Sequence, residues 1–230
     1  MNEILTNPLF GLVLSVLMYL IGVRLNQTFQ HPLTTPLLFA TVTIILFLKI
    51  TGISYDAYYK GGQILNMLIA PSTVALGIPL YKMLPLLKHH AKSILIGLGI
   101  STFLNTLITL LLAKAFGLSK IVSISLLPKS VTTAMAVGIA EKMGGALTLT
   151  LVVVVATGIL TSVIGPPLLN VFGIQDAVAK GVALGGTGHA IGTGSAIQLG
   201  KVEGVMAGVS IGISGILYVF ITPIMIQLFL

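Results

Sequence analysis

Long apolar runs separated by short polar stretches make up almost the whole sequence. Each run is close to the length of about 20 residues that a helix needs to cross the roughly 30 Å hydrocarbon core of a bilayer. The runs are 4–23, 33–50, 62–81, 93–113, 121–141, 146–164, 177–199 and 205–230. This pattern predicts an all-α, multi-pass membrane protein of about eight segments, with residues 1–230 forming a single membrane domain.

Some of these runs are plain and others are interrupted. Pro71 and Pro79 lie inside the third run, and Pro128 lies in the middle of the fifth. The seventh run carries six glycines around His189. Proline lacks a backbone donor and breaks a helix, and plain helices interleaved with discontinuous ones are typical of secondary carriers. The pattern therefore favours an elevator-like carrier, and it leaves open whether the fifth and seventh runs cross the bilayer or fold back.

The two proline breaks share a short sequence form. They read Pro71-Ser72-Thr73-Val74 and Pro128-Lys129-Ser130-Val131. Each break follows apolar residues and precedes a stretch of small ones. An internal repeat would produce this match, and so would chance, because the match is only four positions long.

The composition excludes a soluble protein. Only 7% of the residues are charged and 56% are hydrophobic, whereas about 25% of a typical soluble domain is charged. The net charge of +7 comes from basic residues that stand singly between apolar runs, as in the short loops of membrane proteins, so we expect no nucleic acid partner. The most basic loop, 82–92, is expected in the cytoplasm, with the chain in the inner (plasma) membrane. Cysteine is absent, which excludes disulfides and thiolate metal sites.

Lys129 lies near the middle of the fifth apolar run. A lysine at mid-depth of a bilayer costs about 2.5 kcal/mol or more, so its presence favours a function. The alternative is that the segment is re-entrant and that the side chain extends to an interface.

A helix end is expected directly after this lysine. Pro128 would interrupt the helix and Ser130 would cap the next one, leaving the N–H groups of residues 131–133 unpaired. Anions bind at such helix ends, and Thr132 and Thr133 add hydroxyl donors. The break at Pro71 and Thr73 would line the same cavity with carbonyls and hydroxyls, or would be an ordinary proline kink.

His189 is the second polar candidate inside an apolar run. It stands among glycines and between Thr187 and Thr193, and glycines such as Gly192 allow a backbone or a ligand to approach closely. The alternative is a buried histidine with a satisfied hydrogen bond. The glycines do not form a dinucleotide-binding motif, because Ile191 stands where that motif has its third glycine.

The interior charge balance favours a small anion. The acidic residues lie near segment ends or at the terminus, which leaves one lysine, one histidine and several hydroxyls at mid-depth. A small monocarboxylate fits this set, and His189 could couple its transport to protons. No catalytic triad, carboxylate pair or metal cluster is recognisable, so we expect no enzyme, no metal and no cofactor. A passive anion channel is a further alternative.

The last run carries small residues at four-residue spacing, namely Gly204, Gly208 and Gly212. Such a face allows close helix contact. It fits a homodimer or higher homo-oligomer, and equally packing within one subunit.

Three strings carry a resemblance to a known family. They are Ala70-Pro71-Ser72-Thr73-Val74, Leu127-Pro128-Lys129-Ser130-Val131-Thr132-Thr133 and His189-Ala190-Ile191-Gly192-Thr193. They resemble the LrgB/CidB family of antiholin-like and holin-like membrane proteins, over almost the whole chain. The chain is also similar to the C-terminal half of the plastid glycolate/glycerate translocator. Ala134 stands where the family usually has Pro, and Gly188 where it usually has Ser.

The resemblance implies two functions. One is a carrier of small monocarboxylates such as pyruvate, glycolate or glycerate. The other is a holin/antiholin-like role in autolysis, programmed cell death and membrane permeability, beside a small LrgA/CidA-type membrane partner. The substrate-binding residues that it implies are Lys129, Ser130, Thr132, Thr133, His189, Gly192 and Thr193, joined by Pro71 and Thr73.

Overall fold

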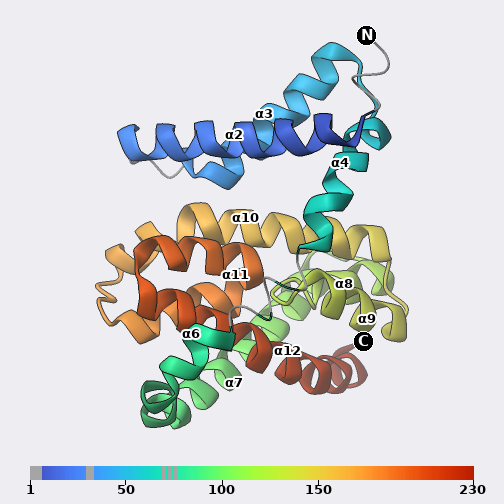
Figure 1. Ribbon diagram of the computed structural model, residues 1–230. Coiled ribbons are helices and arrows are strands. Elements are labelled where there is room, and N and C mark those ends of the chain that lie inside the picture. Colours follow the sequence, from blue (N-terminus) through green and yellow to red (C-terminus); the bar gives the residue numbers. More distant parts are fainter. Residues whose placement is uncertain (1–6, 30–33, 69–70, 72–73, 75–76) are drawn as a thin grey trace. The chain divides into compact units, whose positions relative to one another are not determined.

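The regular structure of the chain is helical throughout the part that the computed structural model describes, which is residues 7–29, 34–68, 71, 74 and 77–230. The helices are α2 (Pro8–Phe29), α3 (Pro36–Thr51), α4 (Tyr55–Met67), α6 (Gly77–Lys82), α7 (Leu84–Ala115), α8 (Lys120–Leu126), α9 (Thr133–Met143), α10 (Leu147–Val171), α11 (Ala177–Leu199) and α12 (Lys201–Phe229) (Figure 1). They divide into two compact units, 1–78 and 79–230.

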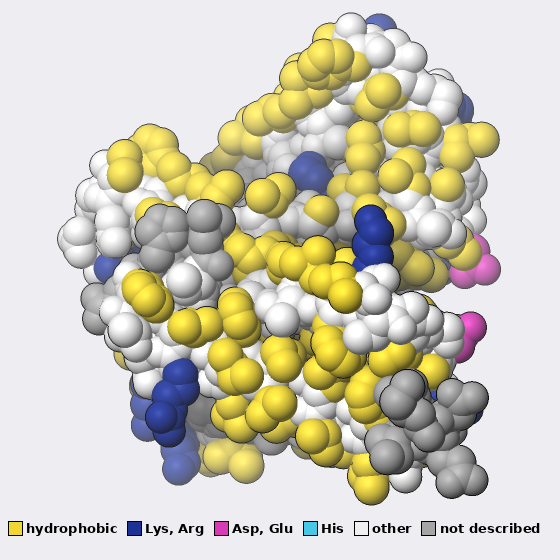
Figure 2. Space-filling model, turned by 90° about the horizontal axis from the view of Figure 1, so that it is seen from above, with side chains coloured by type: hydrophobic (Ala, Val, Ile, Leu, Met, Phe, Trp, Pro, Cys, Tyr) yellow, Lys and Arg dark blue, Asp and Glu magenta, His cyan; other side chains and the backbone are white. Residues whose placement is uncertain are grey.

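Four helices in the described part of the chain, α2, α7, α10 and α12, are long and apolar enough to cross a bilayer. Helix α3 is apolar but shorter. Large apolar side chains remain exposed along these helices, as an environment of lipid requires, for example Leu20, Ile100, Leu160 and Phe220. Figure 2 shows hydrophobic side chains spread over the visible face, with Lys and Arg in a few separate places. The prediction of an all-α membrane protein is confirmed.

In the N-terminal unit, α2 and α4 approach each other backbone to backbone. A Cβ on Gly11 would lie 2.1 Å from the carbonyl oxygen of Tyr58, and one on Gly61 would lie 2.3 Å from that of Pro8. The Ser15 and Tyr58 hydroxyls share a hydrogen bond of 2.8 Å next to this crossing. Helix α3 packs against α2.

In the C-terminal unit, α11 folds back on itself at His189. This residue has φ 45° and ψ −133°, which interrupts the helix. A Cβ on Gly192 would lie only 2.2 Å from the carbonyl oxygen of Leu184, and Leu184 shares a buried cluster with Ala196. Residues eight apart in a continuous helix would be separated by about 12 Å along its axis. The seventh apolar run is therefore a helical hairpin with His189 at its tip.

The hairpin is too short to cross a membrane. Its arms, 177–188 and 190–199, extend about 18 Å or less each, whereas the hydrocarbon core is roughly 30 Å thick. The first arm runs beside the start of α12, where a Cβ on Gly185 would come within 2.2 Å of the Ala207 carbonyl oxygen. The closely spaced glycines of this run thus permit contact between backbones.

The fifth run folds back as well. Helix α8 ends at Leu126 and α9 begins at Thr133, with a turn between them. After α9, the backbone N–H of Ala146 donates to Ser125 Oγ at 2.8 Å, and Thr150 Oγ1 donates to the Ser125 carbonyl at 3.2 Å. The chain thus returns to the end of α8. Both interrupted runs therefore fold back on themselves, and their turns are called re-entrant in this sense.

Candidate functional site

Lys129 lies in the turn of the fifth run and reaches the middle of α7. Its Nζ donates to Asn105 Oδ1 at 2.8 Å and to Thr109 Oγ1 at 2.5 Å. Asn105 and Thr109 are four residues apart and therefore lie one above the other on the same helix face. Lys129 is partly buried, and an ammonium has three N–H donors, of which these two hydrogen bonds use two.

Asn105 connects Lys129 to two more hydroxyls. Its Nδ2 donates to Ser130 Oγ at 3.2 Å and to the Tyr218 hydroxyl of α12. Thr109 Oγ1 in turn donates to the Asn105 carbonyl at 2.7 Å. Ser130 and Tyr218 are buried, at 3% and 1% exposure. The amide therefore fixes the turn between the two long helices α7 and α12.

The acceptors that the structure describes for the Lys129 ammonium carry no charge, because they are an amide oxygen and a hydroxyl. The described carboxylates lie at helix ends: Asp56 in the first turn of α4, Glu141 near the end of α9, Asp176 at the N-cap of α11 and Glu203 in the first turn of α12. A cation held by neutral groups in a low dielectric favours the approach of an anion.

Helix α9 begins close to Lys129. Thr132 is its N-cap residue, and the Thr132 hydroxyl makes no capping hydrogen bond. Thr133 is the first helical residue and is exposed. The N–H groups of a first helical turn lack partners within the helix, so a helix end is present near the lysine, but the helix begins only at Thr133. The expectation that the N–H groups of residues 131–133 are unpaired is wrong for Val131, whose N–H donates to the Pro128 carbonyl at 3.3 Å. The prediction that Ser130 caps this helix is wrong, because the turn extends to Thr132 and Ser130 Oγ accepts from Asn105 instead.

His189 forms the tip of the α11 hairpin. Its Nε2 lies 3.0 Å from the Val154 carbonyl of α10, and because a carbonyl only accepts, Nε2 carries the proton of this hydrogen bond. Thr193 Oγ1 donates to the His189 carbonyl at 2.9 Å. Gly192 lets the returning arm pass against Leu184. His189 is 3% exposed, so the tip is buried, and its hydrogen bond to Val154 orients the ring.

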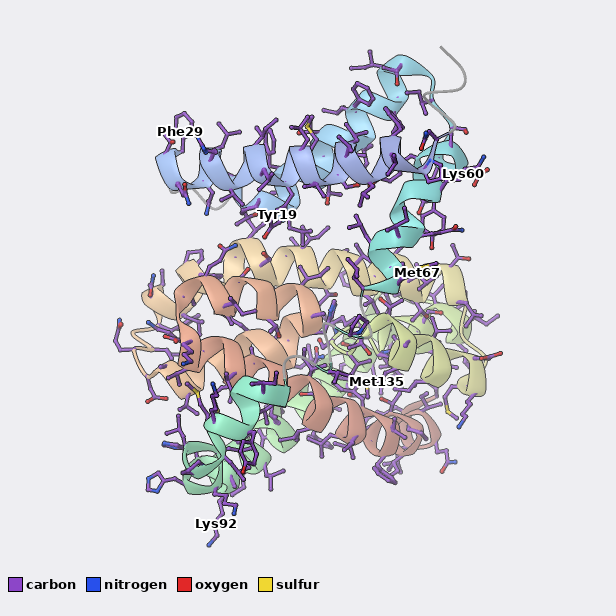
Figure 3. The ribbon with its side chains drawn as sticks, in the orientation of Figure 1. Tyr19, Phe29, Lys60, Met67, Lys92 and Met135 are labelled. Atoms are coloured by element: carbon purple, nitrogen blue, oxygen red, sulfur yellow. The ribbon has the colours of Figure 1, made fainter. Side chains whose placement is uncertain are left out.

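The hairpin tip and the Lys129 turn border the same apolar cluster. Val154, whose carbonyl binds His189, packs in this cluster with Val131 and with Tyr218 of the Asn105 network. Met135 of α9 packs there too and fills the space over Gly215 of α12; Figure 3 labels it within the C-terminal unit. One cluster therefore joins the two re-entrant turns.

The comparison with protein families agrees with these features. The model of the LrgB-like family matches residues 15–228. The chain belongs to the LrgB-like family. Its relatives include two proteins called "Antiholin-like protein LrgB", from Bacillus cereus (strain B4264) and Bacillus anthracis (strain CDC 684 / NRRL 3495). Each is 35% identical over 220 residues, which cover 94% of this chain and 94% of the relative. No solved structure matches the chain.

The structure brings most of the expected site residues of this LrgB-like protein into two neighbouring groups. The first group is Lys129, Ser130, Thr132 and Thr133, and the second is His189, Gly192 and Thr193. Pro71 is exposed and belongs to the N-terminal unit. Thr73 lies outside the described residues. Their assignment to the substrate site stays a prediction.

The sequence analysis did not identify Asn105 and Thr109, which accept from Lys129, or Tyr218, which accepts from Asn105. The run 93–113 was interpreted as a plain helix although Asn105 and Thr109 stand one turn apart within it. Polar side chains inside an apolar segment are costly and tend to face the protein interior. The four-residue spacing of Asn105 and Thr109 was the signal that could have identified these two residues.

The glycines of α12 do not act as one face within the subunit. Gly204 packs against Ile197, where a Cβ would come within 2.7 Å, whereas positions 208 and 212 have no heavy atom within 4 Å of such a Cβ. The homo-oligomer expected from this spacing stays a prediction.

Proposed function

We propose that this LrgB-like protein is a secondary carrier of small monocarboxylates, such as pyruvate, glycolate or glycerate, in the inner (plasma) membrane. The observation that carries the proposal is the ammonium of Lys129, which neutral acceptors hold at the turn of a re-entrant segment. A substrate carboxylate would supply the missing negative charge and form a charge-assisted hydrogen bond.

The number of charges favours one carboxylate over two. Lys129 is the cation of this network, while the groups around it are the uncharged Asn105, Thr109, Ser130 and Tyr218. A second substrate carboxylate would be buried without a partner, which costs several kcal/mol. Hydroxyls nearby, such as those of Thr132 and Thr133, would bind the keto or hydroxyl oxygen of a short acid.

The two re-entrant turns suggest how the carrier alternates its access. Their buried tips would move against the plain helices α7, α10 and α12, as discontinuous helices do in other carriers. His189 would couple this movement to protons through Nδ1. Its Nε2 proton is used in the hydrogen bond to the Val154 carbonyl, so Nδ1 is the nitrogen that would gain or lose the coupled proton.

The direct test is uptake of a radiolabelled monocarboxylate into liposomes that contain the purified protein. We expect saturable uptake that Lys129→Ala abolishes. Lys142→Ala is the matched control, because it removes the same charge from an exposed position in the last turn of α9. Absence of uptake across a panel of short acids, or equal uptake by Lys129→Ala and Lys142→Ala, contradicts the proposal. Single-channel currents without saturation would indicate a passive anion channel instead.

The names of the relatives favour a second candidate function. They are called antiholin-like, which suggests a protein that modulates membrane permeability and autolysis together with a small LrgA/CidA-type partner. In that case liposomes carrying this protein and such a partner would change their leakage of a large dye, and Lys129→Ala would have no selective effect on short acids. Retention of the dye with saturable acid uptake would favour the carrier.

A further inference from the structure

A cavity of about 390 Å³ lies between α7 and the first arm of the α11 hairpin, in the C-terminal unit. This volume lies within the range of about 300–1,000 Å³ that is typical of small-molecule sites. Its lining includes the polar side chains of His90, Ser93, Ser101, Asp176 and Thr187. Neither the resemblance to a family nor the proposed substrate residues account for this cavity.

One end of the cavity lies at the beginning of both helices. His90 is in the second turn of α7, and Asp176 is the N-cap of α11, where its carboxylate accepts from the Ala179 N–H at 2.8 Å. The same turns of α7 carry Lys88 and Lys92, and Lys92 points away from the helices in Figure 3. This end therefore lies beside the most basic stretch of the chain, in which Lys88 and Lys92 outnumber the one carboxylate of the lining, Asp176. A net positive potential attracts anions.

The other end of the cavity approaches the two groups of site residues. Ser101 lines the cavity and lies one helical turn before Asn105, the residue that binds Lys129. Thr187, which also lines it, is two residues before His189 at the hairpin tip.

A buried hydroxyl without a partner lies behind the inner wall. A Cβ on Gly186, a lining residue, would come 3.4 Å from Ser214 Oγ. Ser214 is 1% exposed, and its Oγ makes no hydrogen bond to any residue that the structure describes. Ser214 is one turn before Tyr218 on α12, and Tyr218 belongs to the Lys129 network. A hydroxyl that is buried without a partner is costly in a protein that binds nothing there.

We propose that this cavity is the access route by which the carboxylate reaches Lys129, and that it opens on the side of the membrane where residues 82–92 lie. The inference rests on the proposed carrier function, which it deepens by assigning the side and the path. The anion enters past His90 and passes between Ser101 and Thr187. The buried Ser214 hydroxyl and the Lys129 network lie behind this end of the cavity and are not part of its lining.

The absence of cysteine from the sequence makes a direct test practical, because single cysteines can be introduced without removing any. Ser101→Cys and Thr187→Cys place a thiol at the end of the cavity that is farther from the starts of α7 and α11, where both side chains are exposed. Ile100→Cys is the matched control, because residue 100 is adjacent in sequence and also exposed, at 56%, but is absent from the cavity lining. Lys92→Cys reports the side of the basic stretch.

The measurement is the rate of modification by a membrane-impermeant thiosulfonate, added to right-side-out or inverted vesicles of the full-length protein. The cysteine thiolate attacks the thiosulfonate, forming a mixed disulfide and releasing a sulfinate. Because the thiolate forms in water and not in lipid, we expect Ser101→Cys and Thr187→Cys to react at least about tenfold faster than Ile100→Cys. Both should react from the side that labels Lys92→Cys. Pyruvate should slow their modification, whereas its uncharged amide should not.

Three results would overturn the access route. They are modification of both cavity positions at the rate of Ile100→Cys, modification only from the side opposite to Lys92→Cys, and equal slowing by pyruvate and its amide. The first would mean that lipid fills the cavity. These outcomes differ from failure of the carrier proposal, because the uptake assay with Lys129→Ala is independent of thiol labelling. If the cavity positions react with the reagent but the protein takes up no acid, the cavity is a water-filled pocket and the carboxylate path is disproved.

Discussion

The imidazole of His189 lies directly against the backbone of Gly158, so that a Cβ at position 158 would come within 2.8 Å of the ring carbon Cε1 and 3.0 Å of Nε2. Gly158 is buried in α10 one turn after Val154, whose carbonyl binds the same ring. The side chain of Ile191 also lies 2.8 Å from this point. The His189 ring therefore has no free space into which it could move. Its position at the hairpin tip requires that residue 158 has no side chain.

We expect Gly158→Ala to displace His189 and break its hydrogen bond to Val154. Overpacking of this kind costs about 1–3 kcal/mol of stability, so thermal unfolding in detergent should occur at a lower temperature, and acid uptake should fall. Gly138→Ala is the control, because a Cβ there meets nothing within 4 Å. In a helix this replacement should be neutral or stabilising by up to about 1 kcal/mol. Equal behaviour of the two variants would contradict the predicted clash.

A second prediction concerns the charge beside Lys129. Asn105→Asp would place a carboxylate where the amide oxygen now accepts from Nζ at 2.8 Å. The new charge-assisted bond would be stronger than the present one by about 1 kcal/mol or more, and it would compete with the substrate for the same ammonium. We expect tighter folding together with an apparent substrate affinity that is lower by about tenfold or more.

Asn105→Ala is the companion variant. It removes the amide without adding charge, so it should lower stability while leaving the ammonium available. Thermal unfolding and the concentration dependence of uptake are measured for both variants. If Asn105→Asp transported short acids with the affinity of Asn105→Ala, Lys129 would not be the group that binds the carboxylate.

The pattern of apolar runs was sufficient to predict the membrane class and the breaks of the fifth and seventh runs. It did not give all helix bounds, because the stretch 82–92 was expected to be a loop and is mostly helical, with α7 beginning at Leu84. Pro128 and the glycines around His189 mark the two re-entrant turns, because a proline and a dense set of glycines both oppose a continuous helix. Their return paths could not be read from the sequence. They depend on contacts between distant residues, such as the hydrogen bond from Ala146 to Ser125 and the approach of Gly192 to Leu184.

The candidate site was predictable only in its outline. Lys129 and His189 were evident because an ionisable side chain in an apolar run is costly, and such side chains mark functional sites. Their partners were not, since Asn105 and Tyr218 come from plain helices that pack against the turn. The same reason explains why Thr132, and not Ser130, is the N-cap residue. The Asn105 amide donates a hydrogen bond to the Ser130 hydroxyl, and the sequence of one segment does not show which donor another segment brings to it.

Ser214 provides a third prediction. Its hydroxyl has no partner among the described residues, so Ser214→Ala removes an unsatisfied polar group and should leave stability unchanged or raise it. A role in binding would nevertheless make uptake weaker. Ser210→Ala is the control on the same helix face, because the Ser210 hydroxyl already donates to the Met206 carbonyl at 2.7 Å. Unchanged uptake by Ser214→Ala would remove this hydroxyl from the anion path.

The backbone of His189 leads to the last prediction. Its φ of 45° is the one positive value at a non-glycine residue in the described part of the chain, and such conformations cost about 1–3 kcal/mol. His189→Gly and His189→Ala both lose the bond to Val154, but only glycine adopts this conformation without strain. We therefore expect the glycine variant to unfold at a higher temperature than the alanine variant, by about 1 kcal/mol or more of stability after allowance for the greater flexibility of unfolded glycine.

The same pair of variants separates strain from proton coupling. If His189 carries the coupled proton, neither variant will accumulate a monocarboxylate in response to a pH gradient, while exchange of labelled for unlabelled acid continues in the glycine variant, whose hairpin is relaxed. If His189→Gly and His189→Ala unfolded at the same temperature, the backbone strain at the hairpin tip would be disproved. Accumulation driven by a pH gradient in the glycine variant would remove the coupling role, because no imidazole would remain at the tip to take up the proton.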